Sequence, residues 1–425
     1  MEKGKRNGLV KAAMALTTIA ALGVSGIASA KSYQPSQHMH TPSHEKAKSV
    51  ILFVGDGMGA VQRDAIRLAT VGLNGDLEMN KMPYAGIVHT SSTSTVTDSA
   101  AAATAMASGV KTYNGAIGMD ANKVSKKTVL EEAEEAGKST GLVTTSQITD
   151  ATPAAFGAHV ANRSEQSKIA KQYLENSKVD VLLGGGEDYW YPAGNAGAYE
   201  DHPAKDPSEA SKGTEGNLVE EAKKRGYQYV MNASGLQKAN GNKLLGLFAN
   251  EEMFEQRPEG DGDQYDPVVS LPTMVEKAIG TLSKNKKGFF LMVEEEAIDE
   301  MAHENNATQL IKAGQQLDNA VDVAKDYAKK HPDTLVLVLA DHDCGGMAIE
   351  GVDNSDESGD GISKEDGPFQ VAGSDQQFMV DWTTSGHTAA DIPLTAMGRG
   401  ASLFEGTYEN TYIHDALLKA MGLGK

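Results

Sequence analysis

The stretch SVILFVGDG, residues 49–57, decides the fold of this chain. It is a continuous apolar run that ends in glycine and aspartate. Strands that are buried on both faces of a parallel sheet have this uninterrupted apolar character. The stretch therefore predicts a central strand whose carboxyl end opens a loop at Asp56.

Similar apolar runs alternate with helical patterns along the rest of the chain. This alternation predicts an α/β fold: a three-layer sandwich with a mostly parallel central sheet, helices on both faces and insertion loops that form a small cap or crown. Residues 49–425 are expected to form one domain, with insertions near 187–217, 250–270 and 345–375. The expected strands cover residues 86–90, 140–145, 179–183, 227–231, 244–248, 288–293, 334–340, 376–381 and 392–397, and the expected helices cover 98–109, 128–137, 164–176, 217–225, 271–284, 307–330 and 410–421.

The composition excludes several classes of protein. Of 425 residues, 40% are hydrophobic and 23% are charged, which supports a sizeable core and excludes wholesale disorder. With 45 glycines and a single cysteine, the chain is neither collagen-like nor disulfide-rich. The net charge of −19 repels nucleic-acid backbones and anionic lipids, so neither is an expected partner. A site for an anion must therefore create its own positive potential, most simply with metal ions.

The first 30 residues have the pattern of a secretory signal peptide. Lys3, Lys5 and Arg6 form a basic start, an apolar stretch covers 12–27, and Ala28-Ser29-Ala30 offers a cleavage site. The alternative is a membrane anchor, but the apolar run is short and rich in Gly, Ser and Thr. We expect export to the periplasm or the medium, with residues 31–48 as a flexible leader of the mature chain.

Acidic side chains follow three of the expected strands. They are Asp56, the run Glu294-Glu295-Glu296, and the run Asp341-His342-Asp343. Ligands of open α/β sheets bind outside the carboxyl ends of the strands. One such acid is often only a helix cap, but three acidic strand ends in one sheet are better explained by bound cations.

Two further patterns suit a metal site. Asp299 and His303 are four residues apart, so on a helix both would face one way and could hold one ion; the alternative is a surface helix with a solvated histidine. His387 lies between Gly386 and Thr388, which suggests only a fixed turn. Mixed histidine and carboxylate sets of this kind suit Zn²⁺.

The segment TDSAAA, residues 97–102, places Ser99 in the first turn of an alanine-packed helix. Free N–H groups and the helix dipole favour an oxyanion or phosphate there. The alternative is a helix capped by Thr97 or Asp98 with an incidental serine. No G-x-S-x-G elbow surrounds Ser99, so activation by metal ions is the available route to a nucleophile. Arg163 is either a surface residue or a bidentate clamp on phosphate.

Taken together and in this order, these motifs resemble the alkaline phosphatase family, from about Ser49 to Met421. The resemblance implies a secreted bacterial phosphomonoesterase whose catalytic domain is residues 49–425. The segments that carry it are FVGDGMG (53–59), TDSAA (97–101), GVKTYNG (109–115), DATP (150–153), VE (293–294) with Ile298, Asp299 and His303, ADH (340–342) and GHT (386–388).

The resemblance also implies two zinc ions and one magnesium ion. The residues implied as zinc ligands are Asp299, His303 and His387 for the first ion and Asp56, Asp341 and His342 for the second. The residues implied for magnesium are Asp56, Thr152 and Glu294, with Asp150 behind them. Ser99 would be the nucleophile that forms a covalent phosphoserine from a phosphate monoester, Arg163 the phosphate clamp, and Asp98 the residue that orients Arg163.

The chain departs from the family at two positions. Glu300 stands where relatives often have a basic residue, His or Trp, and Cys344 stands where some have a histidine beside the first zinc. The rate, metal preference and pH profile are therefore left open. A monomer and a homodimer are both open, and Asp266 with the acids of 250–270 is either a solvated loop or an additional Ca²⁺ site.

Two other functions compete with a phosphomonoesterase. A phosphodiesterase of the same superfamily shares the two-metal core but would lack the set of Thr152 and Glu294. A secreted metal- or phosphate-binding protein with a dead active site would have lost a ligand, the nucleophile or the clamp, whereas all of these are in the sequence.

Overall fold

A computed structural model describes residues 46–201, 210–254, 264–352 and 364–424. The described residues belong to one compact unit, Pro42–Lys425. The predicted signal peptide and most of the leader lie outside the described residues, as do parts of the three insertions.

A ten-stranded sheet forms the centre, in the order β15-β2-β14-β8-β1-β7-β3-β4-β6-β5. Every neighbouring pair is parallel except the two that β14 makes with β2 and β8. The predicted mostly parallel sheet is thus confirmed. Its strands are β1 (Ser49–Gly55), β2 (Tyr84–His89), β3 (Ser139–Gln147), β4 (Val181–Gly185), β5 (Gln228–Val230), β6 (Leu244–Leu247), β7 (Phe289–Glu295), β8 (Thr334–Leu339), β14 (Ile392–Gly398) and β15 (Gly406–Glu409).

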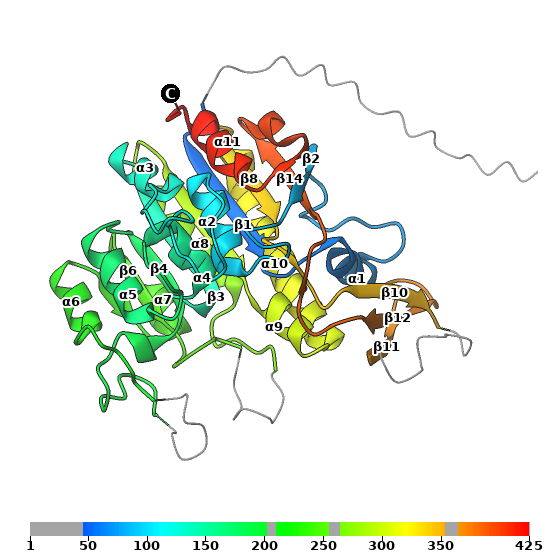
Figure 1. Ribbon diagram of the computed structural model, residues 1–425, viewed down its shortest axis with the longest axis horizontal. Coiled ribbons are helices and arrows are strands. Elements are labelled where there is room, and N and C mark those ends of the chain that lie inside the picture. Colours follow the sequence, from blue (N-terminus) through cyan, green and yellow to red (C-terminus); the bar gives the residue numbers. More distant parts are fainter. Residues whose placement is uncertain (1–45, 202–209, 255–263, 353–363, 425) are drawn as a thin grey trace, which may run out of the picture. The chain divides into compact units, whose positions relative to one another are not determined.

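Helices pack on both sides of this sheet, which gives the predicted three layers (Figure 1). One layer contains α1 (Ala60–Val71), α8 (Leu271–Leu282) and the long helix α10 (Ala307–Lys330). In this layer α10 packs against both α1 and α8. The other contains α2 (Ser99–Ser108), α3 (Val129–Glu135), α4 (Ala151–Gly157) and α11 (Tyr412–Met421). The remaining helices are α5 (Gln166–Glu175), α6 (Leu218–Lys224), α7 (Ala233–Lys238) and α9 (Ala297–His303).

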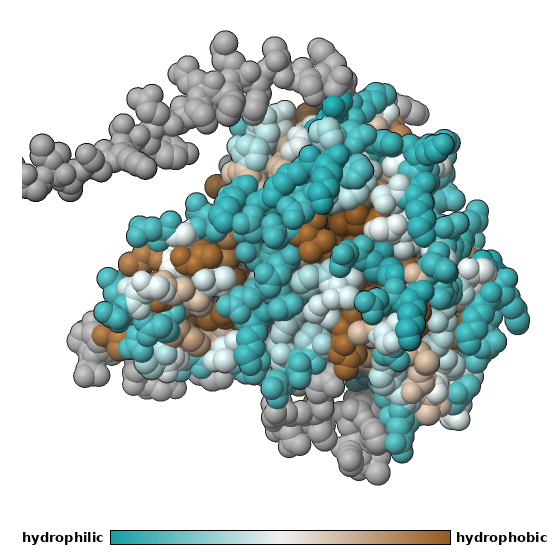
Figure 2. Space-filling view, turned by 180° about the vertical axis from the view of Figure 1, so that it is seen from behind, coloured by the Kyte–Doolittle hydropathy of each residue, from teal (hydrophilic) through white to brown (hydrophobic). Residues whose placement is uncertain are grey.

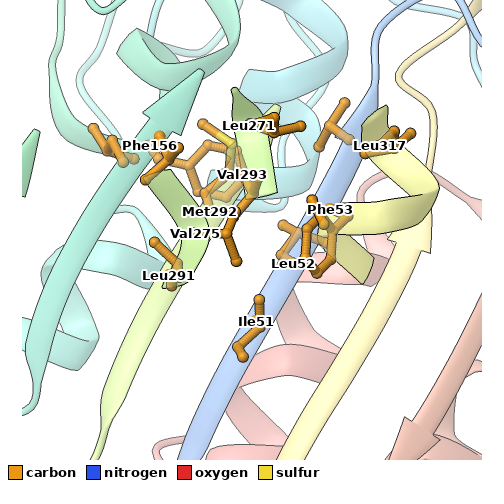
Figure 3. Packing of buried hydrophobic residues seen from close by; sticks show 14 of the residues in the cluster. Ile51, Leu52, Phe53, Phe156, Leu271, Val275, Leu291, Met292, Val293 and Leu317 are labelled. Atoms are coloured by element: carbon orange, nitrogen blue, oxygen red, sulfur yellow. The ribbon is translucent and has the colours of Figure 1, made fainter. Parts of the chain in front are cut away.

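Strand β1 lies in the middle of the sheet, where its apolar run predicted it. All seven of its residues are buried, and β8 and β7 flank it. Figure 3 shows Leu52 and Phe53 of β1 packed with Val293 of β7 and Leu317 of α10. Because both faces of the strand are covered, its backbone has little freedom to move, and the loop that begins at Asp56 starts from a fixed point.

The structure adds elements that the sequence patterns did not predict. Residues 345–375, expected as an insertion, contribute β10 (Met347–Gly351) and β11 (Lys364–Gln370), which flank β12 (Gln377–Trp382) in a separate three-stranded sheet. A two-stranded ladder joins β9 (Asp343–Cys344) to β13 (His387–Thr388). Residues 151–157 form α4, a helix that the sequence patterns did not predict, and Pro153 is tolerated there because it lies in the first turn.

Polar side chains cover most of the face in Figure 2, and apolar ones gather only in small groups. Within the described ranges, no helix combines the length and apolar character that a membrane crossing requires.

Another buried acid follows β4, a strand that β7 and β3 separate from β1 in the sheet. Asp188 follows β4 and is fully buried, and within the described part of the chain neither of its carboxylate oxygens has a hydrogen-bond partner. Burial raises the pKa of Asp188 to about 8. The folded protein therefore keeps a proton at Asp188 that the unfolded chain loses above a pH of about 4.

We predict that this carboxyl makes the protein less stable as the pH rises from about 4 to about 8, because ionisation then favours the unfolded chain. Asp188→Asn should raise the melting temperature by several degrees at pH 9, with little change at pH 4, as measured by differential scanning calorimetry. Asp415→Asn, which alters an exposed acid, should behave the same at both pH values. An equal effect of Asp188→Asn at both pH values would contradict the prediction.

Candidate active site

Three neighbouring strands deliver acids to one edge of the sheet. Strands β8, β1 and β7 are adjacent and parallel, so their carboxyl ends meet. Asp56 follows β1, Glu294 lies at the end of β7, and Asp341 and His342 follow β8. All four side chains are buried. The structure thus brings together the acids that the sequence placed at strand ends.

The first group of candidate metal-ligand atoms comes from α9 and β13. Asp299 and His303 lie one turn apart on α9, as their spacing predicted, and His303 Nε2 is 3.0 Å from Asp299 Oδ2. His387 Nε2 is 3.4 Å from the same oxygen and 3.1 Å from His303 Nε2. In a tetrahedral zinc site with bonds of 2.0–2.1 Å, neighbouring ligand atoms are ~3.3 Å apart. These three atoms therefore have the spacing of one face of such a site.

Backbone carbonyls fix the tautomers of both histidines. His303 Nδ1 donates to Ser385 O at 2.6 Å, and His387 Nδ1 donates to Thr97 O at 3.0 Å. Each Nε2 can then present a lone pair to the centre of the group, which is how histidine binds a metal. Two lone pairs 3.1 Å apart repel each other unless a cation lies between them. A hydrogen bond with Asp299 raises the pKa of His303 to about 9.

The second group surrounds His342. Its Nε2 is 3.1 Å from Asp341 Oδ2, 3.4 Å from Asp56 Oδ1 and 3.2 Å from Ser99 Oγ. Burial lowers the pKa of His342, which keeps the imidazole neutral and able to act as a ligand. Asp299 also lies close to Asp56 and His342, so the two groups are adjacent.

Ser99 is the first residue of α2. Asp98 is the N-cap, and its Oδ1 accepts from Ala101 N at 2.9 Å while its Oδ2 accepts from Gly115 N at 2.8 Å. The two interpretations of this segment therefore hold together: Asp98 caps the helix, and Ser99 lies in the first turn with its hydroxyl directed to His342.

Arg163 pairs chiefly with Asp150. Its Nη2 lies 2.8 Å and 3.1 Å from the two carboxylate oxygens of Asp150, whereas Nη1 is 3.8 Å from Asp98 Oδ2. The resemblance implied that Asp98 orients Arg163. In the structure Arg163 lies closer to Asp150 than to Asp98. The two pairings place the guanidinium beside the start of α2.

A third set lies around Glu294. Thr144 Oγ1 donates to Glu294 Oε2 at 2.6 Å, and Thr152, in the first turn of α4, is fully buried. Burial raises the pKa of Glu294 to about 8, although the hydrogen bond from Thr144 opposes the shift. Carboxylate and hydroxyl oxygens of this kind suit Mg²⁺.

Several buried ligand atoms have no hydrogen-bond partner among the described residues. Buried polar groups are nearly always paired, so a cluster of orphaned atoms indicates a missing ligand. Burial and the neighbouring carboxylates Asp341 and Asp299 also raise the pKa of Asp56 well above its usual value. The residues present therefore fit bound cations. The orphaned atoms are Asp56 Oδ1, Thr152 Oγ1, Asp299 Oδ1, Asp341 Oδ2 and His342 Nδ1.

Two further acids lie beside this centre: Glu296, which ends the acidic run after β7, and Glu252, which the sequence patterns did not single out. Burial raises the pKa of Glu296 well above its usual value, and the negative charges of neighbouring acids, among them Glu300 and Glu252, raise it further. Burial, Asp299 and Glu252 likewise raise the pKa of Glu300 to about 7. Glu252 lies in a loop rich in acids, so no sequence pattern indicated its position beside the site.

Comparisons with known proteins identify one family. A sequence model of the alkaline phosphatase family matches residues 47–371. Alkaline phosphatase 4 of Bacillus subtilis is 33% identical, with 96% of this chain and 97% of the relative aligned. The alkaline phosphatase of Escherichia coli is 34% identical over 90% of this chain and 87% of its own.

Solved structures agree as well. The alkaline phosphatase of the Antarctic bacterium TAB5 is similar with a TM-score of 0.72 and 30% identity, covering 90% of this chain and all of the other. A variant of that enzyme has been described with magnesium bound in its M3 site.

The glycine after Asp56 controls the position of Asp299. Gly57 has a φ of +63°, and a Cβ there would lie 2.9 Å from Asp299 Cα and closer still to Oδ1. We predict that Gly57→Ala displaces Asp299 and lowers the zinc content of the dialysed protein by at least half, as measured by elemental analysis.

Gly373→Ala is the matched control, because Gly373 has a φ of +67° and nothing within 4 Å of its Cβ position. Both variants carry the backbone strain of a left-handed alanine, about 1 kcal/mol. Equal zinc contents in the two variants would show that Gly57 has no special role in the site.

Proposed function

This chain belongs to the alkaline phosphatase family and is a metal-binding hydrolase of phosphate monoesters, and from that premise we propose that it works through a covalent phosphoserine at Ser99. The observation that carries this proposal is the position of Ser99. Its hydroxyl starts α2 and lies 3.2 Å from His342 Nε2, beside both groups of ligand atoms.

The reaction has two displacements at phosphorus. Ser99 Oγ attacks the phosphoryl group, the ester P–O bond breaks, and the alcohol leaves with a proton. Water then attacks the phosphoserine, and the products are inorganic phosphate and free Ser99. The Asp98 cap fixes the first turn of α2 and with it the position of the Ser99 hydroxyl, so little reorganisation is needed before attack.

Arg163 binds the phosphoryl oxygens in this proposal. Asp150 occupies Nη2, which leaves the remaining N–H groups of the planar fork for the substrate. The pairing with Asp150 also holds the guanidinium in one orientation before the substrate arrives, which lowers the entropic cost of binding. Neutralisation of the phosphoryl charge is the largest contribution expected of a protein side chain in phosphoryl transfer.

We assign two zinc ions and one magnesium ion to the three sets of ligands. When bound, these cations supply Lewis acidity and positive charge at the phosphoryl oxygens and at the attacking and leaving oxygens. The assigned ligands are Asp299, His303 and His387 for the first zinc, Asp56, Asp341 and His342 for the second, and Asp56, Thr152 and Glu294 for magnesium, with Asp150 nearby. A further Ca²⁺ near Asp266 stays a prediction, as do export by the signal peptide and a homodimer.

The proposal predicts that Ser99→Ala abolishes turnover without loss of the metal ions. Hydrolysis of p-nitrophenyl phosphate should fall by about 10³-fold or more, because the nucleophile is removed. A chelator should abolish the activity of the wild-type protein, and bis(p-nitrophenyl) phosphate should be a poor substrate. Faster turnover of the diester would assign the chain to a phosphodiesterase, and full activity of Ser99→Ala would contradict the covalent mechanism.

The second prediction concerns the phosphate clamp. Arg163→Lys should raise KM and weaken inhibition by inorganic phosphate by about tenfold, because a lysine offers no bidentate fork. The effect on kcat should be smaller. Arg225→Lys is the control, since Arg225 is exposed and pairs with Glu221 at the end of α6. Unchanged inhibition by phosphate would mean that Arg163 serves only to pair with Asp150.

A further inference from the structure

The single cysteine of the chain lies inside the first group of ligand atoms. Cys344 is fully buried, two residues after His342. Its Sγ lies within 4.8 Å of the ligand atoms of Asp299, His303 and His387, and these four atoms form one mutually close set. Soft thiolate and imidazole ligands together favour zinc over magnesium or calcium.

The backbone fixes the thiol on the same face as a histidine ligand. Cys344 lies directly opposite His387 in the antiparallel ladder of β9 and β13. Residues that face each other in such a ladder have their side chains on the same side, with Cβ atoms about 5 Å apart. Cys344 N also donates to Gly57 O at 3.2 Å, and Gln62 Nε2 donates to Cys344 O at 2.5 Å. The backbone of Cys344 is therefore fixed by three contacts: with the strand of His387, with the loop after β1 and with α1.

The three other atoms leave room for a fourth vertex. Asp299 Oδ2, His303 Nε2 and His387 Nε2 are separated by 3.0–3.4 Å, the spacing of one face of a tetrahedron. Asp299 uses Oδ2 in this set, while its buried Oδ1 lies 3.9 Å from His342 Nδ1 and has no hydrogen-bond partner among the described residues. A cation at the centre of the four atoms would satisfy the carboxylate, both imidazole lone pairs and the sulfur.

We propose that Cys344 Sγ is a fourth protein ligand of the cation held by Asp299, His303 and His387. The inference rests on the proposed function, because it presumes a metal ion in this group. On binding, the thiol releases its proton to solvent and the thiolate coordinates the ion. An ion with four protein ligands is held more tightly, and it must expand to five ligands when a substrate oxygen enters.

Cobalt reports a thiolate ligand directly. The metal-free protein is reconstituted with Co²⁺, its cobalt content is measured, and its absorption spectrum is recorded. Visible d–d bands show that the ion is bound, and an additional near-ultraviolet thiolate-to-cobalt charge-transfer band shows sulfur ligation. Because the chain has one cysteine, such a band can come only from Cys344.

We expect both sets of bands in the wild-type protein and only the d–d bands in Cys344→Ser. Release of zinc to a chromogenic chelator should be at least about tenfold faster in the variant, as expected when a supporting group of a metal site is lost. The wild-type spectrum decides the question even if Cys344→Ser does not fold.

Two results would overturn the inference, and they are distinguishable. Bound cobalt with d–d bands but without the charge-transfer band would show that Cys344 is not a ligand, while the proposed metal site would stand. Failure of the folded wild-type protein to bind cobalt or zinc at all would overturn the metal site itself and the proposed function with it.

Discussion

Repulsion among the carboxylates at the carboxyl edge of β8, β1 and β7 is the constraint on which the rest of the site depends. Asp56, Asp299 and Asp341 lie in a buried space where water cannot screen their charges. Such a cluster persists only if protons or cations neutralise it. Backbone carbonyls hold the Nδ1 protons of His303 and His387, so these imidazoles direct lone pairs inward. The arrangement is therefore built for cations.

The surrounding fold supplies the rigidity that keeps these charges together. β1 is buried along its whole length, and parallel neighbours on both sides fix its carboxyl end. Gly57 lets the chain turn against Asp299, a contact that a larger residue would obstruct. The packing of the apolar core (Figure 3) thus helps to keep these like charges close together.

The sequence predicted the layers, the sheet type and most strands, because apolar runs and their periodicity report burial directly. It also located the acids at strand ends, since parallel strands bring these ends to one edge. It missed α4 because Pro153 resembles a turn signal, and it missed β10 and β11 because their Gly- and Asp-rich segment has no apolar alternation. The pairing of Arg163 with Asp150 also required coordinates, because ion pairs between residues on different elements leave no pattern along the chain.

The same charges explain how an anionic substrate can enter an acidic protein. The chain carries a net charge of −19, and the acids Glu300 and Glu296 lie beside the site, where burial and neighbouring acids raise their pKa values. Arg163 supplies one positive charge, and Asp98 and Asp150 offset part of it. The first turn of α2 contributes only a partial charge, and Asp98 already caps it. These groups offer little net positive charge to a phosphate dianion, and cations held by the carboxylates would supply it. The acids that make the metal-free site repel phosphate are the ones that make the metal-bound site attract it.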